Sequence, residues 1–550
     1  MALLTLAHYT ICTTLILIMK KTFLIIACVS TTIAFGQSKK FQFKTGTEYG
    51  LPKKAEDLSF FGNDKDGIVN LSLKKEALYI TRFNPQTLAQ TGEKVIALSD
   101  ATKNMNSEMV ADFSNNYFWL RSDWDKDTQK EILYATSIDV KNGRISDLNQ
   151  KIIETPKLAG DAVMTGLYRY KKVNKFDFNF DADHTKLLVS YRIAPESKKD
   201  KNSFDKIGIH VFDETLHKIW GNEFIMPYTE ARMDNADFSV DSKGNAYLLA
   251  KVYDSDARKE TDKATGNPAY HLEVFKFTKD NKQVIHATVS VDTYFIREST
   301  LIENALHDMI IACTYSKNAK NKGTEGIFLG ILNTEGKVDG YLKGHYKFPI
   351  SELEKFESAR KRRKMEKKDD YEIPNLRVRD VAVEKDGSVF LACEEYYILQ
   401  KSRMDGNGRF TYYTTFHYED ILATKIDASG NFQWIKKIPK RQEGSRGRGT
   451  MGFKLISDAT GYYFLYLDNL KNLHLEEDDT PAKHVDGLGG QVFVSKVDHN
   501  GNISKELVFN TREEDIMIFP SEFTKINGKQ FIGRAKLKKT LFKPLLITVN

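Results

Sequence analysis

The hydrophobic pattern of this chain consists of short stretches of alternating apolar and polar residues, broken by turns rich in Asp, Asn and Gly. The segment Phe238–Leu249 shows the pattern clearly, with the turn DSKGN at 241–245. Alternation with a period of two indicates strands with one buried face, and a polar turn containing Gly indicates a tight hairpin. The sequence therefore predicts two β-hairpins between Phe238 and Val289, separated by a polar insert.

Both hairpins recur along the chain. Other copies of the first hairpin are Leu58–Ser72, Asp112–Leu120, Phe176–Ser190, Leu301–Ala312, Val381–Leu391, Phe453–Tyr466 and Phe523–Arg534. Copies of the second are Tyr79–Leu98, Tyr134–Ile152, Ile207–Ile225, Phe275–Val289, Phe328–Tyr346, Thr424–Ile438 and Val492–Phe509. The last unit begins its second hairpin at Leu541 and ends one strand short. The strand-like piece Phe41–Lys44 can supply the missing strand.

Repeated four-stranded antiparallel units predict an all-β fold, a β-propeller of about eight blades closed by the N-terminal strand. Such closure leaves no free sheet edge. Seven blades, with one weak unit miscounted, is an alternative. Two β-sandwich domains are another, although no Pro-, Gly- or Ser-rich linker divides the chain. We expect a single propeller domain over residues 37–550.

The long insertions indicate which face of the propeller binds ligands. In a four-stranded blade the first and third turns lie on one face, and the middle loops and blade-to-blade links lie on the other. Here the first and third turns are short, and the long segments fall in the second group. They are 194–206, 254–270, 316–325, 349–376, 401–416, 439–451 and 468–490. Repeat proteins bind partners where insertions cluster, so we expect function on this long-loop face.

One insertion differs in composition from the rest. Residues 351–374 contain the run ELEKFESARKRRKMEKKDD, in which 360–368 is strongly basic. Ser351 and Glu354 have the spacing of a capping box, and good helix formers follow. We expect a short charged helix or arm. A solvated charged surface and a polyanion site are both open interpretations of it.

Two clusters on the long-loop face are candidate binding sites. Aromatic residues flank the middle loop of the sixth unit, residues 401–416. They can stack on sugar rings or hold a peptide, or simply pack within a long hairpin. A basic, Gly-rich link follows, which can hold a carboxylate or phosphate or be an ordinary flexible loop. The candidate residues are Tyr396, Tyr397, Tyr412, Tyr413, Arg441, Arg446 and Arg448.

The N-terminus indicates export. Two lysines at 20–21 precede the apolar segment Thr22–Phe35, and small residues before Gln37 suit a cleavage site. This pattern predicts a secretory signal peptide over residues 1–36, with 1–18 as an over-extended start. A lipoprotein signal at Cys28 and a membrane anchor are the alternatives. We expect a periplasmic, outer-membrane-associated or extracellular monomer without a transmembrane segment in the mature chain.

Charge and motifs exclude several classes of function. A net charge of +7 on 550 residues is mild and does not favour nucleic acid binding. Cys313 and Cys393 lie in similar strands and are expected to be buried thiols. The sequence contains no nucleophile elbow, P-loop or paired-cysteine metal motif. We therefore predict no catalytic residues, metal site or cofactor.

Two resemblances bear on this interpretation. The sequence DASGNFQW at 427–434 resembles the repeat of PQQ-like propellers, in which Asp, Gly and Trp dock neighbouring blades, and Trp220 gives a looser second case. The adjacent cysteines of the quinone-dependent members are missing here. With its signal sequence, the chain also resembles uncharacterised secreted propellers of Bacteroidota, which implies a cell-envelope location.

The function predicted from these features is a non-enzymatic binding or scaffold propeller of the cell envelope. It would engage a protein or glycan through the long-loop face. The alternative is a propeller hydrolase or lyase acting on extracellular polysaccharide or peptide, with a carboxylate-lined central funnel. An enzyme needs converging acid and base side chains with shifted pKa values, whereas a scaffold needs a broad surface.

Overall fold

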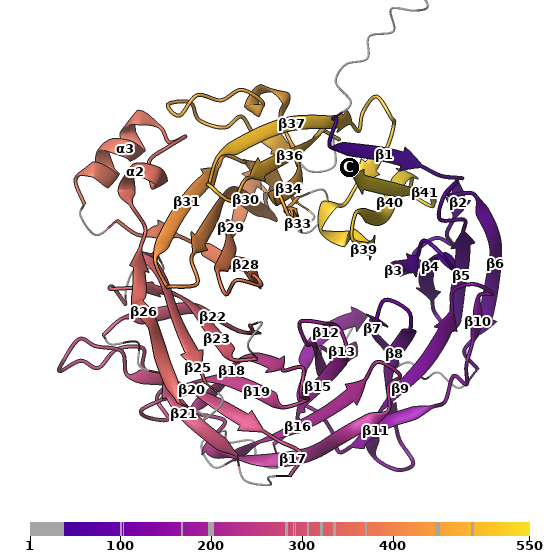
Figure 1. Ribbon diagram of the computed structural model, residues 1–550. Coiled ribbons are helices and arrows are strands. Elements are labelled where there is room, and N and C mark those ends of the chain that lie inside the picture. The colour runs from indigo at the N-terminus through magenta and orange to yellow at the C-terminus, as the bar shows by residue number, and fades with distance from the viewer. Residues whose placement is uncertain are drawn as a thin grey trace, which may run out of the picture.

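The computed structural model describes residues 38–550 except 100–101, 103, 167–168, 196–202, 281–283, 290, 292, 305–306, 320–322, 334–336, 369–370, 446–450 and 486–488. The predicted signal peptide and Cys28 therefore lie outside the described residues. Antiparallel sheets are arranged around a ring, which defines a β-propeller and confirms the predicted fold class (Figure 1). Within the described residues, eight of the sheets have four or more strands, and we number them 1 to 8 in chain order.

The first four sheets follow one another along the chain. Sheet 1 contains β3 (Glu56–Asn63), β4 (Gly67–Lys74), β5 (Ala77–Phe83) and β6 (Gln90–Ala97). Sheet 2 contains β7 (Asn106–Asp112), β8 (Tyr117–Asp125), β9 (Lys130–Asp139), β10 (Arg144–Ile145) and β11 (Lys151–Thr155). Sheet 3 contains β14 (Phe176–Phe180), β15 (Lys186–Arg192), β16 (Phe204–Asp213) and β17 (Lys218–Thr229). Sheet 4 contains β18 (Met233–Val240), β19 (Ala246–Tyr253), β20 (Tyr270–Phe277) and β21 (Ile285–Val289).

The second half of the ring carries the longer insertions. Sheet 5 contains β22 (Phe295–Glu303), β23 (Met309–Ser316), β25 (Gly326–Leu332) and β26 (Val338–Lys347). Sheet 6 contains β28 (Leu376–Val383), β29 (Val389–Met404), β30 (Phe410–Ile426), β31 (Phe432–Ile438), β32 (Gln442–Gly444) and β35 (His484–Val485). Sheet 7 contains β33 (Lys454–Asp458), β34 (Gly461–Asp468), β36 (Gln491–Val497) and β37 (Ile503–Asn510). Sheet 8 contains β38 (Met517–Ile518), β39 (Thr524–Asn527), β40 (Gln530–Lys538), β41 (Leu541–Val549), β1 (Phe41–Thr45) and β2 (Tyr49–Gly50).

Short elements connect the sheets. Two small two-stranded sheets are the hairpin of β12 (Asp161–Gly166) with β13 (Arg169–Val173), and the pair of β24 (Gly323–Thr324) with β27 (Ile373–Pro374). The helices are α2 (Ile350–Leu353), α3 (Ala359–Glu366), and the 3₁₀ turns η2 (Leu470–Asn472) and η3 (Pro520–Glu522). No helix of the described residues is long and apolar enough to cross a membrane.

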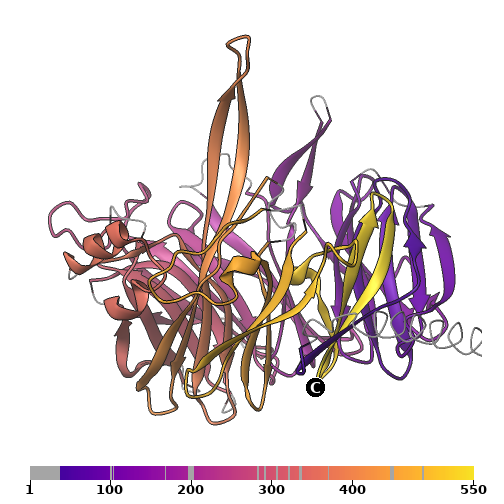
Figure 2. The same ribbon diagram turned by 90° about the horizontal axis from the view of Figure 1, so that it is seen from above.

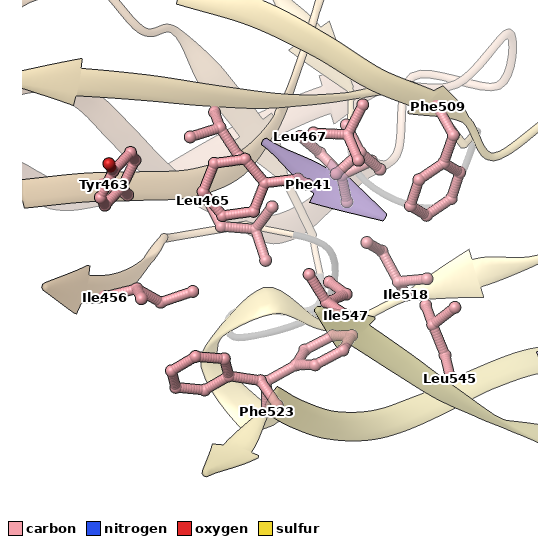
Figure 3. Packing of buried hydrophobic residues seen from close by; sticks show 14 of the residues in the cluster. Phe41, Ile456, Tyr463, Leu465, Leu467, Phe509, Ile518, Phe523, Leu545 and Ile547 are labelled. Carbon is pink, nitrogen blue, oxygen red and sulfur yellow. The ribbon is translucent and has the colours of Figure 1, made fainter. Parts of the chain in front are cut away.

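The N-terminal strand closes the ring, as predicted. β1 pairs antiparallel with the last strand β41, with Phe41 opposite Val549 and Thr45 opposite Leu545. Phe41 is 1% exposed and lies in a cluster shared by sheets 7 and 8 (Figure 3). Its ring meets that of Tyr463 edge-on at 5.3 Å between centroids. Two ends of the chain thus complete one sheet.

The tight turns have a shared hydrogen-bonding pattern. In the turn at 241–245 the Asp241 carboxylate accepts from the Asn245 amide at 2.8 Å, and Gly244 has φ +82°. The turns at 427–431 and 498–502 repeat this arrangement. An Asp that accepts from the backbone and a Gly that adopts positive φ are what such turns require.

These turns also receive side chains from the preceding sheet. The indole of Trp220 in β17 donates to the Gly244 carbonyl at 2.7 Å, and that of Trp434 in β31 donates to the His499 carbonyl at 3.1 Å. The Tyr346 hydroxyl in β26 donates to Gly430 in the same manner, at 2.7 Å. An outer-strand ring that bonds to the next sheet's turn fixes the register between neighbouring sheets.

The insertion at 351–374 folds against sheet 6. Helix α3 is capped by Ser358, whose side chain accepts from the Lys361 amide, while α2 begins after Pro349 without a side-chain cap. The predicted cap at Ser351 is wrong, because that residue lies inside α2. Met365 of α3 is buried in the core shared by sheets 5 and 6. The basic insertion is therefore a packed helical element, not a free arm.

Candidate functional site

The hairpin β29–β30 is the most prominent feature of the long-loop face. Its strands stay paired from Val389 opposite Ile426 out to Met404 opposite Phe410, far beyond the sheet. The turn at 405–409 closes it, with the Asp405 carboxylate accepting from the Arg409 amide at 2.9 Å. Figure 2 shows this hairpin, in orange-brown, projecting from one side of the ring, and the β12–β13 hairpin, in purple, rising from the same side. We call residues 398–416 the arm.

A cleft lies at the base of the arm, where three long segments meet. It has a volume of about 510 Å³. Sheet 6, the helical insertion and the loop between β34 and β36 all contribute walls. Its lining residues are Phe356, Glu357, Ser358, Lys361, Pro374, Asn375, Glu395, Tyr397, Glu419, Asp420, Lys440, Arg441, Thr480 and Pro481. Charged and polar groups thus dominate a recess that the sequence pattern alone does not bring together.

Tyr397 forms one wall of the cleft. Its ring stacks on His417 of the facing strand, with 4.5 Å between centroids, and its hydroxyl donates to Glu419 at 3.2 Å. Burial, together with the negative charge of Glu419, raises the pKa of the Tyr397 hydroxyl. Burial and the neighbouring Asp420 raise the pKa of Glu419. Tyr397 therefore stays a neutral hydrogen-bonding group over the physiological range.

Glu395 is the most perturbed acid in the cleft. Its side chain is 9% exposed, and no side chain of the described residues forms an ion pair with its carboxyl group. Burial, which Lys361 partly offsets, raises its pKa from 4.5 to about 7. A carboxylic acid with that pKa exchanges between donor and acceptor near neutrality. Glu395 also reaches a small internal cavity beneath the cleft, lined in part by Met365 and Leu422.

Lys437 ties the insertion to sheet 6 beside the cleft. Its ammonium group lies 2.8 Å from Glu357 and 3.1 Å from Asp420, and also donates to the Leu353 carbonyl at 2.9 Å. The surrounding carboxylates raise its pKa against the opposing effect of burial. Lys361 of α3 shares Glu357 at 2.8 Å. Lys361 of the basic insertion is therefore engaged in an ion pair in the wall of the cleft.

Glu443 in β32 anchors the root of the arm. It lies 2.8 Å from Lys401 of the arm and 2.9 Å from Lys483 of the loop before β35. Hydrogen bonds from these two lysines lower the pKa of Glu443 to about 2. The arm is therefore fastened to the body at physiological pH.

The predicted aromatic residues do not form one cluster. Tyr396 and Tyr397 point to opposite sides of the sheet, because side chains alternate along a strand. Tyr396 packs against Tyr418 with 4.7 Å between centroids, and the Arg379 guanidinium lies 5.0 Å from its ring. Tyr412 and Tyr413 lie on opposite faces of the arm and are 74% and 44% exposed. Only Tyr397 of the four lines the cleft.

Of the three predicted arginines, the structure describes Arg441. Arg441 lines the cleft, with its Nε 4.0 Å from Glu419. Arg446 and Arg448 lie outside the described residues, so their placement stays a prediction. The neighbouring Lys440 is fully buried, 2.8 Å from Glu394.

A second recess lies toward the middle of the ring. It has a volume of about 380 Å³, and Asp380, Lys454 and Glu522 are among its lining residues. The first strands of the sheets lie nearest the centre of the ring (Figure 1). Loss of solvation raises the pKa of Asp380 in β28 and of Asp237 in β18, and lowers that of Lys454. The Thr300 hydroxyl of the next sheet donates to the Asp237 carboxylate at 2.6 Å. Some of these polar groups therefore link neighbouring sheets.

Sequence reasoning missed the acids that line the cleft at the base of the arm. Glu394-Glu395 in β29 and Glu419-Asp420 in β30 are pairs of carboxylates inside strands, where such residues are depleted. That departure from strand composition is the signal that marks them. Lys437 in β31 is likewise a charged residue inside a strand, and it is only 4% exposed. Among the described residues no group of three or more His, Cys, Asp or Glu side chains is placed to hold a metal ion.

Comparison with known proteins finds distant structural similarity. No family model and no curated protein matches this chain. The β-propeller domain of the Trilobed protease from Pyrococcus furiosus is 11% identical, with 84% of this chain and 97% of that chain covered and a TM-score of 0.33. The Dos1 propeller is 9% identical, with 92% and 94% covered and a TM-score of 0.37.

A peptidase is also among the similar structures. The acylaminoacyl peptidase of Pyrococcus horikoshii is 11% identical, with a TM-score of 0.35. The match covers 88% of this chain but only 57% of the peptidase. Likeness at this level does not extend to activity.

Proposed function

We propose that the protein is a non-enzymatic binding or scaffold propeller of the cell envelope, which engages a protein or glycan through its long-loop face. The observation that carries the proposal is the cleft of about 510 Å³, where sheet 6 at the root of the arm, the helical insertion and the loop between β34 and β36 meet. Insertions that converge on one recess form a binding surface in many repeat proteins. The signal peptide predicted at the N-terminus is the basis for the proposed location in the cell envelope.

The lining of the cleft suits a ligand rich in hydroxyl or amide groups. Tyr397, Glu419 and Arg441 present hydrogen-bonding groups along one wall. Glu395, with a pKa of about 7, can either donate to or accept from a neutral ligand. Planar polar side chains beside an aromatic ring are what sugar hydroxyls and peptide amides both require.

The test compares ligand capture by cleft variants and by a matched variant on the opposite face. Glycan arrays and pull-downs from the native envelope are carried out with the unaltered protein, Tyr397→Ala with Arg441→Ala, and Lys385→Ala. We expect the paired cleft variant to lose the captured ligand and Lys385→Ala to retain it. Capture that survives both the cleft change and deletion of residues 401–416 contradicts the proposal.

A propeller hydrolase or lyase is the second candidate, favoured by Glu395 and Glu419 together. Burial raises the pKa of both carboxyl groups, and an acid that titrates near neutrality suits general acid catalysis. Extracellular polysaccharides and peptides are the substrates to screen. An enzyme would lose turnover in Glu395→Gln while still binding its substrate. Absence of turnover by the unaltered protein on any substrate that it binds contradicts this alternative.

A further inference from the structure

The arm exposes apolar side chains on both of its faces. Strand pairing places Ser402 opposite Tyr412 and Met404 opposite Phe410, so these residues share one face with Ile398. The opposite face carries Leu399 and Tyr413. Exposed fractions are 50% for Ile398, 42% for Leu399, 60% for Met404, 60% for Phe410, 74% for Tyr412 and 44% for Tyr413. Such a concentration of exposed apolar surface on a monomer marks an interaction site.

The arm is also basic. Residues 398–416 contain Arg403, Arg409 and Lys401, which pairs with Glu443, and the single acid Asp405. The Asp405 carboxylate accepts hydrogen bonds from two backbone amides of the tip turn, those of Asn407 and Arg409, each at 2.9 Å. Neither arginine forms an ion pair with the described residues, so the tip presents positive charge beside its apolar groups. The complementary surface is therefore anionic.

The shape of the arm distinguishes among anionic surfaces. A folded protein docks on one face of a projecting ribbon and leaves the other in water, whereas a fluid lipid layer surrounds a ribbon on every side. The paired residues from 399 to 404 give the ribbon a reach of about 20 Å, at about 3.3 Å per residue. Its two outer edges carry unpaired backbone groups, which hydrocarbon does not tolerate, so insertion stops in the headgroup region.

We propose that the arm binds an anionic lipid bilayer, with Met404, Phe410 and Tyr412 inserted at the headgroup boundary. Arg403 and Arg409 contact lipid phosphates, and aromatic rings occupy the interface that they favour in membranes. This inference goes beyond the proposed function, because the cleft and its ligand lie at the root of the arm and take no part in it. A result that contradicts the membrane proposal therefore does not contradict the proposed function of the cleft, and the reverse also holds.

The test measures binding of the full chain to vesicles. Vesicles of phosphatidylglycerol mixed with phosphatidylcholine are compared with vesicles of phosphatidylcholine alone, at low and high salt. We expect binding to the anionic vesicles that salt weakens, since screening reduces attraction between exposed charges. Equal binding to both vesicle types, or no binding to either, overturns the proposal.

Two arm variants and two matched controls assign the binding to the arm. Arg403→Glu with Arg409→Glu, and Met404→Ser with Phe410→Ser, are each expected to lower the partition coefficient about tenfold or more. Controls with the same chemistry are Lys243→Glu with Lys385→Glu, in turns on the opposite face, and Ile225→Ser, which is 66% exposed on β17. Controls that lose as much binding as the arm variants overturn the proposal.

A spectroscopic readout separates insertion from adsorption. Phe410→Trp places an indole at the tip, and its emission is expected to shift to the blue with anionic vesicles. Collisional quenchers in the lipid are then expected to reach this indole. Emission that stays unshifted while the protein co-sediments means surface adsorption only and contradicts insertion. Capture of an acidic protein through the arm without vesicle binding also overturns the proposal.

Discussion

At the residue scale, Glu395 shows how burial decides what a side chain does. The same residue type at Glu443 has a pKa lowered to about 2 by two lysines, whereas Glu395, without an ion pair among the described residues, has a pKa raised to about 7. Desolvation penalises the charged form, and only a close opposite charge offsets it. Two glutamates on sheet 6 therefore carry different charges at neutral pH.

This difference predicts a pH-dependent effect of Glu395→Gln on stability. The folded-state pKa lies above the ordinary value of 4.5, so the folded protein binds the proton more tightly than the unfolded chain. Glu395 therefore lowers stability as pH rises from about 4.5 to about 7, by up to about 3 kcal/mol. We expect Glu395→Gln to be more stable than the unaltered protein at pH 8 and similar at pH 4, measured by urea unfolding. A stability difference that does not change with pH contradicts the assigned pKa.

At the scale of elements, the turns and the outer strands cooperate. Trp434 of sheet 6 donates to the turn of sheet 7, and Trp220 of sheet 3 donates to the turn of sheet 4. The turn at 241–245, which the sequence predicts as a tight hairpin turn, is thus a docking point between sheets. Both tryptophans named for the PQQ-like resemblance make this contact, and the family itself stays a prediction.

Trp434→Phe tests the contribution of this contact. The substitution keeps a large ring but removes the donor to His499, leaving that carbonyl without its partner. We expect a loss of about 1 kcal/mol in unfolding free energy. Trp124→Phe is the matched control, because the Trp124 indole donates to no residue of the described chain. Equal losses in the two variants, measured by thermal unfolding, contradict a specific role for the bond.

At the scale of the whole molecule, closure depends on residues from both ends of the chain. β1 pairs with β41 over five residues, and Phe41 fills the core between sheets 7 and 8. A propeller without this strand has an unpaired edge at β41, which favours aggregation. Closure therefore links the stability of the last sheet to a segment more than 490 residues earlier.

Phe41→Ala measures the strength of that link. Truncating a buried aromatic residue costs about 3–5 kcal/mol, since it removes apolar contacts and leaves a cavity. We expect lower thermal stability and faster proteolysis within sheet 8 than in sheet 4. Phe43→Ala, at a half-buried position of the same strand, is the matched control and is expected to lose less. Uniform loss of protection around the ring contradicts closure through β1.

The sequence alone determined the repeated hairpins, the all-β class and the closing strand, because each depends on alternation and turn chemistry over a few neighbouring residues. It also predicted the insertion at 401–416, which lies within the arm. Tertiary structure decided which of the candidate residues meet. Tyr396 and Tyr397 differ by one position, and the pleat sends them to opposite sides of sheet 6.

The cleft itself could not be predicted from local pattern. Glu395 and Lys437 belong to two strands of sheet 6, and Glu357 joins them because the helical insertion packs against that sheet through Leu353 and Met365. The pKa values of Glu395 and Lys437 depend on desolvation, which arises when the segments close over these two residues. The sequence thus determined the strands and the face on which they carry insertions, while packing between distant segments decided the chemistry found there.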